Sequence, residues 1–462
     1  MTKPLVMMTH VCRSWRNVLV STPSLWTQLD FCVPAGPQQV EEFLRRSGNL
    51  PLDIHHYLKD MGVADPFLSI TLDNMHRLRH LELSSRIAHL GLFLAYFSEP
   101  APELEYLRIT HDPSIAARDI ELPGTIFGGQ LPKLSSITLV NMYTDLRKPA
   151  LPSLTRFSFT TRTQISFRDL TSFLQQHPLL EFLQICLQYA PQPPVPPPHK
   201  RIRLPALKEL RFDQTACASG LLDHLILPKC TEMLLKGQLI GEGLDGFGGL
   251  FAQIHPSSID HLPVTRGITK AVAAPRSCVL SGPNGHFGAW FFEENHRSLN
   301  AEFFISFYPI LVFGVKELWI AAGEVLRFGR VPWRHTAAGL RAAFGVLTEV
   351  EDLTVVSCET GPIFAVLDAT MDDIVLLPGL RRLTVYVGWG DLNVSTLMRS
   401  AKTRKQYYQP LEEVAIIFEN EPRSYVIQAV ESLRAFVGKV NHRVGVTPVL
   451  RWEGYYEERD RW

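Results

Sequence analysis

The feature that most constrains this chain is a hexapeptide pattern that recurs along most of its length. In each copy, an apolar residue is followed by two variable residues, a second apolar residue, one variable residue and a third apolar residue. The eleven copies begin at residues 78, 104, 134, 154, 180, 207, 230, 315, 350, 380 and 411. Apart from one gap of 85 residues, successive copies start 20 to 35 residues apart. A period of this size is typical of proteins built from stacked supersecondary units.

The three apolar positions of each copy, here called the first, second and third anchors, predict a short β-strand. The last three positions alternate apolar, variable, apolar, as in a strand with one buried face, and the first anchor would pack beneath it. Because proline fixes φ and has no N–H, a proline before a copy is expected to stand at the entry of the strand and to end the preceding helix. Seven copies carry one two residues before the first anchor: Pro102, Pro132, Pro152, Pro178, Pro205, Pro228 and Pro378.

The segments between copies have room for a helix. Residues 166–177 predict one, because Ser166 can cap it and Leu170, Phe173 and Leu174 form an apolar edge. Residues 86–98 predict another. A single strand and helix cannot bury their apolar faces alone, so neighbouring units must stack. We therefore predict an α/β fold in which short parallel strands line one face of a curved solenoid and helices lie outside.

This pattern resembles a leucine-rich repeat of the irregular kind. The resemblance covers residues 78–235 and 315–416, but the family's asparagine three residues after the strand is missing from the first six copies. We expect a first solenoid part over residues 31–235 and a second over residues 311–420. In the last segment, residues 421–462, an amphipathic helix over 424–437 would cap the open end. The alternative is an ordinary α/β protein with short strands.

The 85-residue gap begins with a glycine-rich segment. Gly241, Gly243 and Gly246 match G-x-G-x-x-G, but no clear helix follows before Pro256, so we favour a flexible loop and expect no cofactor. Four apolar runs follow between residues 268 and 307, and the sequence Pro-Asn-Gly at 283–285 predicts a tight turn between two of them. We expect residues 236–310 to form this loop and a small antiparallel β insertion.

The N-terminus carries a motif of a different kind. Residues 9–20 have helical periodicity, and Thr22-Pro23 ends the helix. The runs VCRSWR at 11–16 and PSLW at 23–26, with Leu29, resemble the second half of an F-box. Residues 46–54, RSGNLPLDI, are similar to F-box proteins of mushroom-forming fungi, which join this module to loose leucine-rich repeats. An F-box starts with a Leu-Pro helix, and only ten residues precede Val11, so we expect a partial, helical F-box over residues 1–30. The alternative is an N-terminal cap of the solenoid.

The resemblance implies a substrate receptor of an SCF-type ubiquitin ligase, located in the cytoplasm or the nucleus. The F-box would bind a Skp-family adaptor and, through it, the cullin ligase core, while the repeats would hold an unknown target protein. The residues that the resemblance assigns to the adaptor contact are Val11, Cys12, Trp15, Arg16, Pro23, Leu25 and Trp26.

The target would bind the inner face of the solenoid. In such a fold the variable residues on either side of the second anchor point out of the concave sheet. Their mixed composition suits a protein or peptide better than a phosphate backbone, and aromatic and arginine side chains are the usual anchors. The candidates of this kind are Tyr106, Arg108, Phe182, Arg211, Trp319 and Arg382.

Charge and composition argue against several other classes of protein. Lys+Arg and Asp+Glu both number 46, so the zero net charge gives no overall attraction to nucleic acid or to an anionic membrane. No apolar run reaches membrane-spanning length, and no secretory signal is evident. The seven cysteines include no C-x-x-C pair, which indicates free thiols rather than disulfides or a zinc site.

The sequence shows no catalytic motif, because H-E-x-x-H, G-x-S-x-G and the P-loop are all missing. His55-His56 and Asp372-Asp373 are adjacent pairs whose members would point to opposite faces of a strand, so neither predicts a metal site. We therefore expect a non-catalytic protein. Two other functions stay open: a repeat-based binding scaffold with no ligase link, and a hydrolase whose catalytic residues are distant in the sequence.

Overall fold

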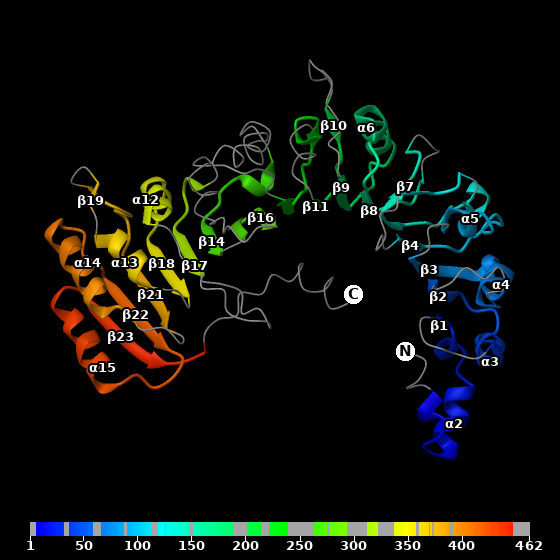
Figure 1. Cartoon of the computed structure of the whole chain (residues 1–462), viewed down its shortest axis with the longest axis horizontal. Coiled ribbons are helices and arrows are strands. Elements are labelled where there is room, and N and C mark those ends of the chain that lie inside the picture. Colours follow the sequence, from blue (N-terminus) through cyan, green and yellow to red (C-terminus); the bar gives the residue numbers. More distant parts are fainter. Residues whose placement is uncertain are drawn as a thin grey trace. The chain divides into compact units, whose positions relative to one another are not determined.

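The computed structural model divides the chain into two compact units, unit 1 over residues 1–230 and unit 2 over residues 231–462. It describes residues 6–31, 37–58, 66–86, 90–111, 119–124, 126–146, 151–187, 201–213, 221–238, 262–274, 277–292, 312–321, 337–356, 360–368, 370–371, 374–387 and 392–446. Each unit combines a largely parallel sheet with helices, so the predicted α/β class is confirmed (Figure 1). The G-x-G-x-x-G glycines, Asp372-Asp373 and the last apolar run of the insertion lie outside the described residues.

The sheet of unit 1 is parallel throughout its principal ladder. Each strand pairs with the next one in the ladder, so that equivalent anchors lie side by side, as in Leu81, Leu107 and Ile137. In order, the strands are β1 (Gln28–Asp30), β2 (Leu52–Leu58), β3 (Leu78–Ser85), β4 (Tyr106–His111), β6 (Ser136–Val140), β8 (Arg156–Thr161), β9 (Phe182–Leu187) and β11 (Glu209–Phe212).

The sheet of unit 2 includes the predicted insertion. Strand β15 is antiparallel to both of its neighbours, β14 and β16, whereas β16 is parallel to β13 and β14 is parallel to β17. The antiparallel strands therefore continue the sheet. The predicted turn joins β15 to β16, where a Cβ on Gly285 would lie only 1.9 Å from the carbonyl oxygen of Thr231. The strands in order are β13 (Glu232–Gln238), β16 (Gly285–Phe292), β15 (Ser277–Gly282), β14 (Lys270–Ala274), β17 (Glu317–Ala321), β18 (Asp352–Val356), β21 (Arg382–Val387), β22 (Glu413–Phe418) and β23 (Lys439–Val444).

The recurring proline stands in a turn and not at the strand entry. In each of these seven copies, the N–H of the first anchor donates to the carbonyl three residues earlier, at 3.0–3.4 Å, as Leu104 does to Ala101. The proline is the second residue of that four-residue turn, where its fixed φ is favoured. The strand begins only after the first anchor. The prediction that the proline stands at the entry of the strand was therefore wrong, because the proline lies in the turn before the strand.

The same backbone joint recurs in both units. In seven of the copies, the carbonyl of the residue after the first anchor accepts two N–H groups from the next copy in the ladder. Glu105 O accepts from Ser135 N and Ser136 N at 2.9 and 3.0 Å, and Lys316 O accepts from Glu351 N and Asp352 N at 2.8 and 2.9 Å. Each of these copies thus satisfies the polar groups at the start of the neighbouring copy, which is what stacking of small units requires.

Helices lie along one side of the strands within each unit (Figure 1). The predicted helix at 166–177 is confirmed, the one at 86–98 is shorter, and the one at 424–437 ends in the 3₁₀ helix η6 (Ser432–Ala435). The α-helices that lie wholly within the described residues include α2 (Arg13–Val20), α3 (Pro37–Ser47), α4 (Pro66–Asp73), α5 (Leu90–Leu94), α6 (Phe167–Gln176), α12 (Ala337–Val346), α13 (Thr360–Asp368), α14 (Val394–Gln406) and α15 (Ser424–Glu431).

Some of the segments between copies also carry short outer strands. The copies that start at 134 and 207 span only 20 and 23 residues. Their outer sides carry β7 (Met142–Tyr143) and β12 (Leu225–Ile226). These pair with β5 (Ile120–Glu121) and β10 (Ile202–Arg203) of the preceding copies.

Copies of the pattern near the two ends of the chain were not recognised in the sequence. Trp26, Leu29 and Phe31 have the anchor spacing and are 1%, 1% and 7% exposed, and β1 between them belongs to the parallel sheet. At the other end, Val437 and Val440 are buried anchors and His442 takes the third position in β23, which pairs with β22. The sheet of unit 1 therefore begins before residue 31, and the sheet of unit 2 continues beyond residue 420.

Candidate functional site: the open face of each sheet and an exposed N-terminal helix

One face of each sheet holds the anchors, and helices cover it; the Phe157 ring, for example, lies 4.6 Å from that of Phe173 in α6. The opposite face, here called the open face, carries the variable residues in two rows. The first row lies just before the second anchors, and the second row lies just after them. Strand register places all six predicted target-binding residues in these rows: Tyr106, Phe182 and Arg382 in the first, and Arg108, Arg211 and Trp319 in the second.

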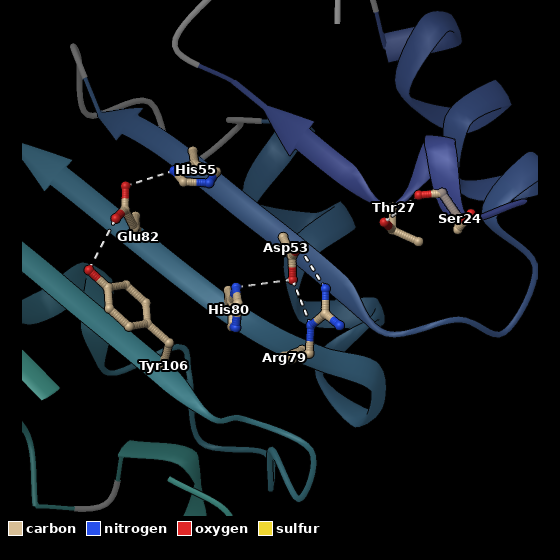
Figure 2. Close-up of polar contacts among 8 residues, drawn as sticks. All are labelled: Ser24, Thr27, Asp53, His55, Arg79, His80, Glu82 and Tyr106. Atoms are coloured by element: carbon tan, nitrogen blue, oxygen red, sulfur yellow. Dashed lines mark hydrogen bonds and ion pairs between the residues drawn. The ribbon is translucent and has the colours of Figure 1, made fainter. Parts of the chain in front are cut away.

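A group of polar side chains occupies the open face of β2, β3 and β4 (Figure 2). The carboxylate of Asp53, which is only 5% exposed, accepts two hydrogen bonds from Arg79, at 3.0 Å from Nε and 2.8 Å from Nη2. Nδ1 of His80 lies 3.3 Å from the same carboxylate. The hydrogen bond to Asp53 raises the pKa of the Arg79 guanidinium. The charge of the buried Asp53 carboxylate is therefore balanced by the Arg79 guanidinium.

A second carboxylate in this group links two neighbouring strands. Figure 2 shows His55 and Tyr106 approaching Glu82 from opposite sides, at 2.7 Å from Nδ1 and 3.3 Å from the phenol oxygen. The hydrogen bond to Glu82 raises the pKa of His55, and the same bond lowers the pKa of Glu82. Burial raises the pKa of Tyr106, which keeps the phenol protonated as a donor.

We predict that replacing Glu82 by Gln lowers the pKa of His55 in a histidine NMR titration, because the imidazolium loses its charged acceptor. The stabilisation from the His55 imidazolium is complete below its unfolded pKa of about 6.5 and fades as pH rises through the higher folded value. The stabilisation from the Glu82 carboxylate is lost as pH falls through the lowered pKa of Glu82 in the folded state. Both side chains are about one-third or more exposed, so the pair contributes under about 1 kcal/mol. Exposed Glu121, in the same unit, supplies the control: an equal change of the His55 pKa in Glu121→Gln would refute the assignment.

Phe182 does not have the exposed position that the sequence predicted. Its side chain is on the open face but only 7% exposed, because two guanidinium groups cover it. Cζ of Arg156 lies 4.3 Å from the ring centroid, and Cζ of Arg211 lies 5.5 Å from it. Arg211 is itself 11% exposed and ion-paired with Glu209. Arg156, which was not among the predicted binding residues, is therefore the exposed group at this point.

The first row of unit 2 neutralises its own charges. Lys270 pairs with Glu317 at 2.8 Å, Arg382 makes a two-point contact with Asp352, and Lys439 pairs with Glu413 at 3.1 Å. Trp319 is partly covered, since Nζ of Lys270 lies 4.4 Å from its ring centroid and its indole N–H donates to Glu317. The predicted candidates Trp319 and Arg382 thus have partners within their own sheet.

The N-terminal helix α2, unlike these residues, has apolar side chains that stay exposed. No residue of α2 is buried, although it is strongly amphipathic. Cys12 caps it, with Sγ accepting the Trp15 N–H at 3.5 Å, and Arg16 donates from Nε to Thr9 O at 2.8 Å. A set of apolar side chains in and beside this helix, here called the N-terminal patch, is 40–71% exposed: Met7, Met8, Val11, Trp15, Val18 and Leu25. Single exposed apolar residues are ordinary, but six within nineteen residues indicate a contact surface.

Trp26, in contrast with the other assigned adaptor residues, is a core residue. Its ring is 1% exposed, meets Phe43 of α3 edge-on at 4.9 Å and lies 4.3 Å below Cζ of Arg46. Its indole N–H donates to Leu19 O at 2.8 Å, which ties the end of α2 to the sheet. In this structure Trp26 therefore offers almost no exposed surface to an adaptor. Val11, Cys12, Trp15, Arg16, Pro23 and Leu25 are exposed.

The described residues include no group of three or more His, Cys, Asp or Glu side chains placed to hold a metal ion. His55 and His56 point to opposite faces as predicted: His55 contacts Glu82, whereas His56 is 4% exposed and 5.4 Å from the Phe31 ring. Within the same part of the chain, no helix is both long and apolar enough to cross a membrane.

Comparison with known proteins adds no family. No protein-family model matches the chain, and no curated protein is significantly similar to it.

Proposed function

We propose that this protein is a substrate receptor of an SCF-type ubiquitin ligase, acting in the cytoplasm or the nucleus. In this proposal the copies form a leucine-rich-repeat-like solenoid, preceded by the second half of an F-box. The N-terminal patch binds a Skp-family adaptor that links it to the cullin core, and the open face holds the target protein.

The uncovered apolar side of α2 carries the adaptor part of the proposal. A helix that belonged only to the fold would bury this side, yet Trp15 and Val18 are 52% and 61% exposed. Amphipathic helices with exposed anchors at such spacing commonly enter the groove of a partner. The F-box-like residues Val11, Cys12 and Arg16 lie in and beside the same helix.

The open face supports the receptor part. Parallel sheets are normally covered on both faces, but the first row in β3, β4 and β8 consists of half-buried or exposed side chains. Its residues are polar, aromatic and basic, which is a composition found at protein interfaces. A protein target would complete the cover.

One observation favours the alternative of a binding scaffold with no ligase link. Trp26 is fully accounted for as the first anchor of β1, and Leu29 as its second anchor. Packing within the sheet thus explains part of the F-box-like motif without any adaptor.

The experiment that separates the two functions is a pulldown of a purified Skp-family adaptor by the full chain. We expect capture by the wild type and a loss of about tenfold in affinity for Trp15→Ala, as for a typical interface anchor. The matched control is Leu92→Ala in α5, because Leu92 is also apolar and is 66% exposed. Adaptor capture that fails in the wild type, or is weakened equally by both variants, would favour the scaffold.

A further inference from the structure

Arg156 lies on the open face of unit 1. It is the first-row residue of β8, in register between Ser136 of β6 and Phe182 of β9. Its side chain is exposed, and its guanidinium is stacked over the Phe182 ring. Such stacking restricts the side chain while leaving the N–H groups at the rim of the guanidinium able to donate.

Arg156 differs from its basic neighbours in having no carboxylate partner. Nearby, Arg79 pairs with Asp53, Arg211 with Glu209, and Lys208 with Glu181. In the part of the chain that the structure describes, the side chain of Arg156 makes no ion pair and no hydrogen bond, and it contacts the Phe182 ring. Glu181, a carboxylate that senses the charge of Arg156, pairs with Lys208 at 2.8 Å.

The surroundings of Arg156 indicate which kind of anionic ligand its guanidinium would bind. A planar guanidinium fixed on an aromatic ring is pre-organised for two-point contact with a carboxylate. The adjacent strand β6 supplies hydroxyl groups, Ser136 in the first row and Thr138 in the second. Carboxylates follow on the other side, at Glu181, Glu209 and Asp213, so a long polyanion would meet repulsion there.

We propose that Arg156 is the anchor for an acidic peptide segment of the target, whose Asp or Glu carboxylate binds its guanidinium on the open face of unit 1. This inference rests on the proposed receptor function and names the chemistry that the receptor recognises. It also predicts a weakening of binding with added salt, because the Arg156 guanidinium is exposed.

The test uses the full chain and a phage-displayed library of random dodecapeptides. We expect the selected peptides to be enriched in Asp and Glu, and their synthetic forms to bind Arg156→Gln about tenfold more weakly, the loss typical of one charged hydrogen-bonded contact. Arg156→Lys keeps the charge without the planar fork and should show an intermediate loss. The control is Arg168→Gln, since Arg168 is an exposed arginine on α6, on the opposite side of the same sheet.

The possible results separate this inference from the proposed function. Selected peptides that lack acidic residues, or that bind Arg156→Gln as well as the wild type, would overturn the role of Arg156 while the receptor function stands. If a fluorescent single-stranded oligonucleotide bound the chain in a way that depends on Arg156, the ligand of Arg156 would be a nucleic acid and the acidic-peptide proposal would be overturned. If the chain selects no peptide above background, the receptor function and this inference are both refuted.

Discussion

Replacing Arg404 by Met should destabilise unit 2 by about 4 kcal/mol, because it leaves buried carbonyl groups without donors. Arg404 is completely buried in α14. Nη1 donates to Leu376 O at 2.9 Å, and Nη2 donates to Leu377 O at 2.9 Å and to Leu380 O at 3.3 Å. Methionine has a similar length and fills the space, so the loss would report the polar contacts and not a cavity.

The position of these carbonyls explains the size of the effect. Leu377 to Leu380 form the turn that carries Pro378 and sets the start of β21. Arg404 thus joins the outer helix that follows β21 to the turn that precedes β21. Burial lowers the pKa of its guanidinium to about 10, so it remains charged at neutral pH.

Urea denaturation followed by hydrogen exchange mass spectrometry would measure this prediction and locate it. Peptides from β21 and α14 should exchange at lower urea in Arg404→Met than in the wild type. Lys402→Met is the control, since Lys402 is exposed on the same helix and its loss should cost less than about 0.5 kcal/mol. Equal stability of the two variants would mean that the turn does not need these hydrogen bonds.

Arg404 also shows what the sequence could not reveal. AKTRK at 401–405 has the composition of a solvated loop. The structure places it in α14, with Ala401 and Arg404 facing inward. Nothing in a run of letters shows that a turn 24 residues earlier leaves carbonyls for one arginine to satisfy. Arg77 is a similar case in unit 1, where it donates to Leu50 O at 3.3 Å.

The parallel sheet, in contrast, could be predicted because its signal is local and repeated. Three anchors at fixed spacing specify which side of each strand is buried, and eleven copies make chance agreement improbable. The copies that were missed have an unusual residue at one anchor, Trp26 at one end of the chain and His442 at the other. The short outer strands were missed because two residues cannot show a periodicity.

The sequence also predicts which residues lie in the two rows of the open face, but it does not predict the contacts between their side chains. Alternation places Tyr106, Phe182 and Arg382 on that face, and the register confirms it. Whether such a residue is exposed depends on side chains from neighbouring strands that lie 20 or more residues away in sequence. The Phe182 ring packs against the guanidinium of Arg156, and Arg382 forms an ion pair with Asp352.

The second large effect is expected for Trp26, where a core role and an adaptor role predict different outcomes. Trp26→Ala should lower the free energy of unfolding of unit 1 by about 3–5 kcal/mol, as for other buried tryptophans. It removes the contacts with Phe43 and Arg46 and the hydrogen bond to Leu19 O. Trp26→Phe would keep most of the packing and lose the hydrogen bond, at a cost of about 1 kcal/mol for that bond.

Trp15→Ala is the matched control, because it also replaces a tryptophan of the motif, but one that is 52% exposed. We expect its unfolding curve to coincide with that of the wild type to within about 0.5 kcal/mol. If adaptor capture is lost in Trp15→Ala at unchanged stability, Trp15 acts at the surface, whereas Trp26 acts by fixing the end of α2 to the first strand. A stable Trp26→Ala variant would instead show that unit 1 does not depend on this anchor, and that the copy at 26–31 is not part of its core.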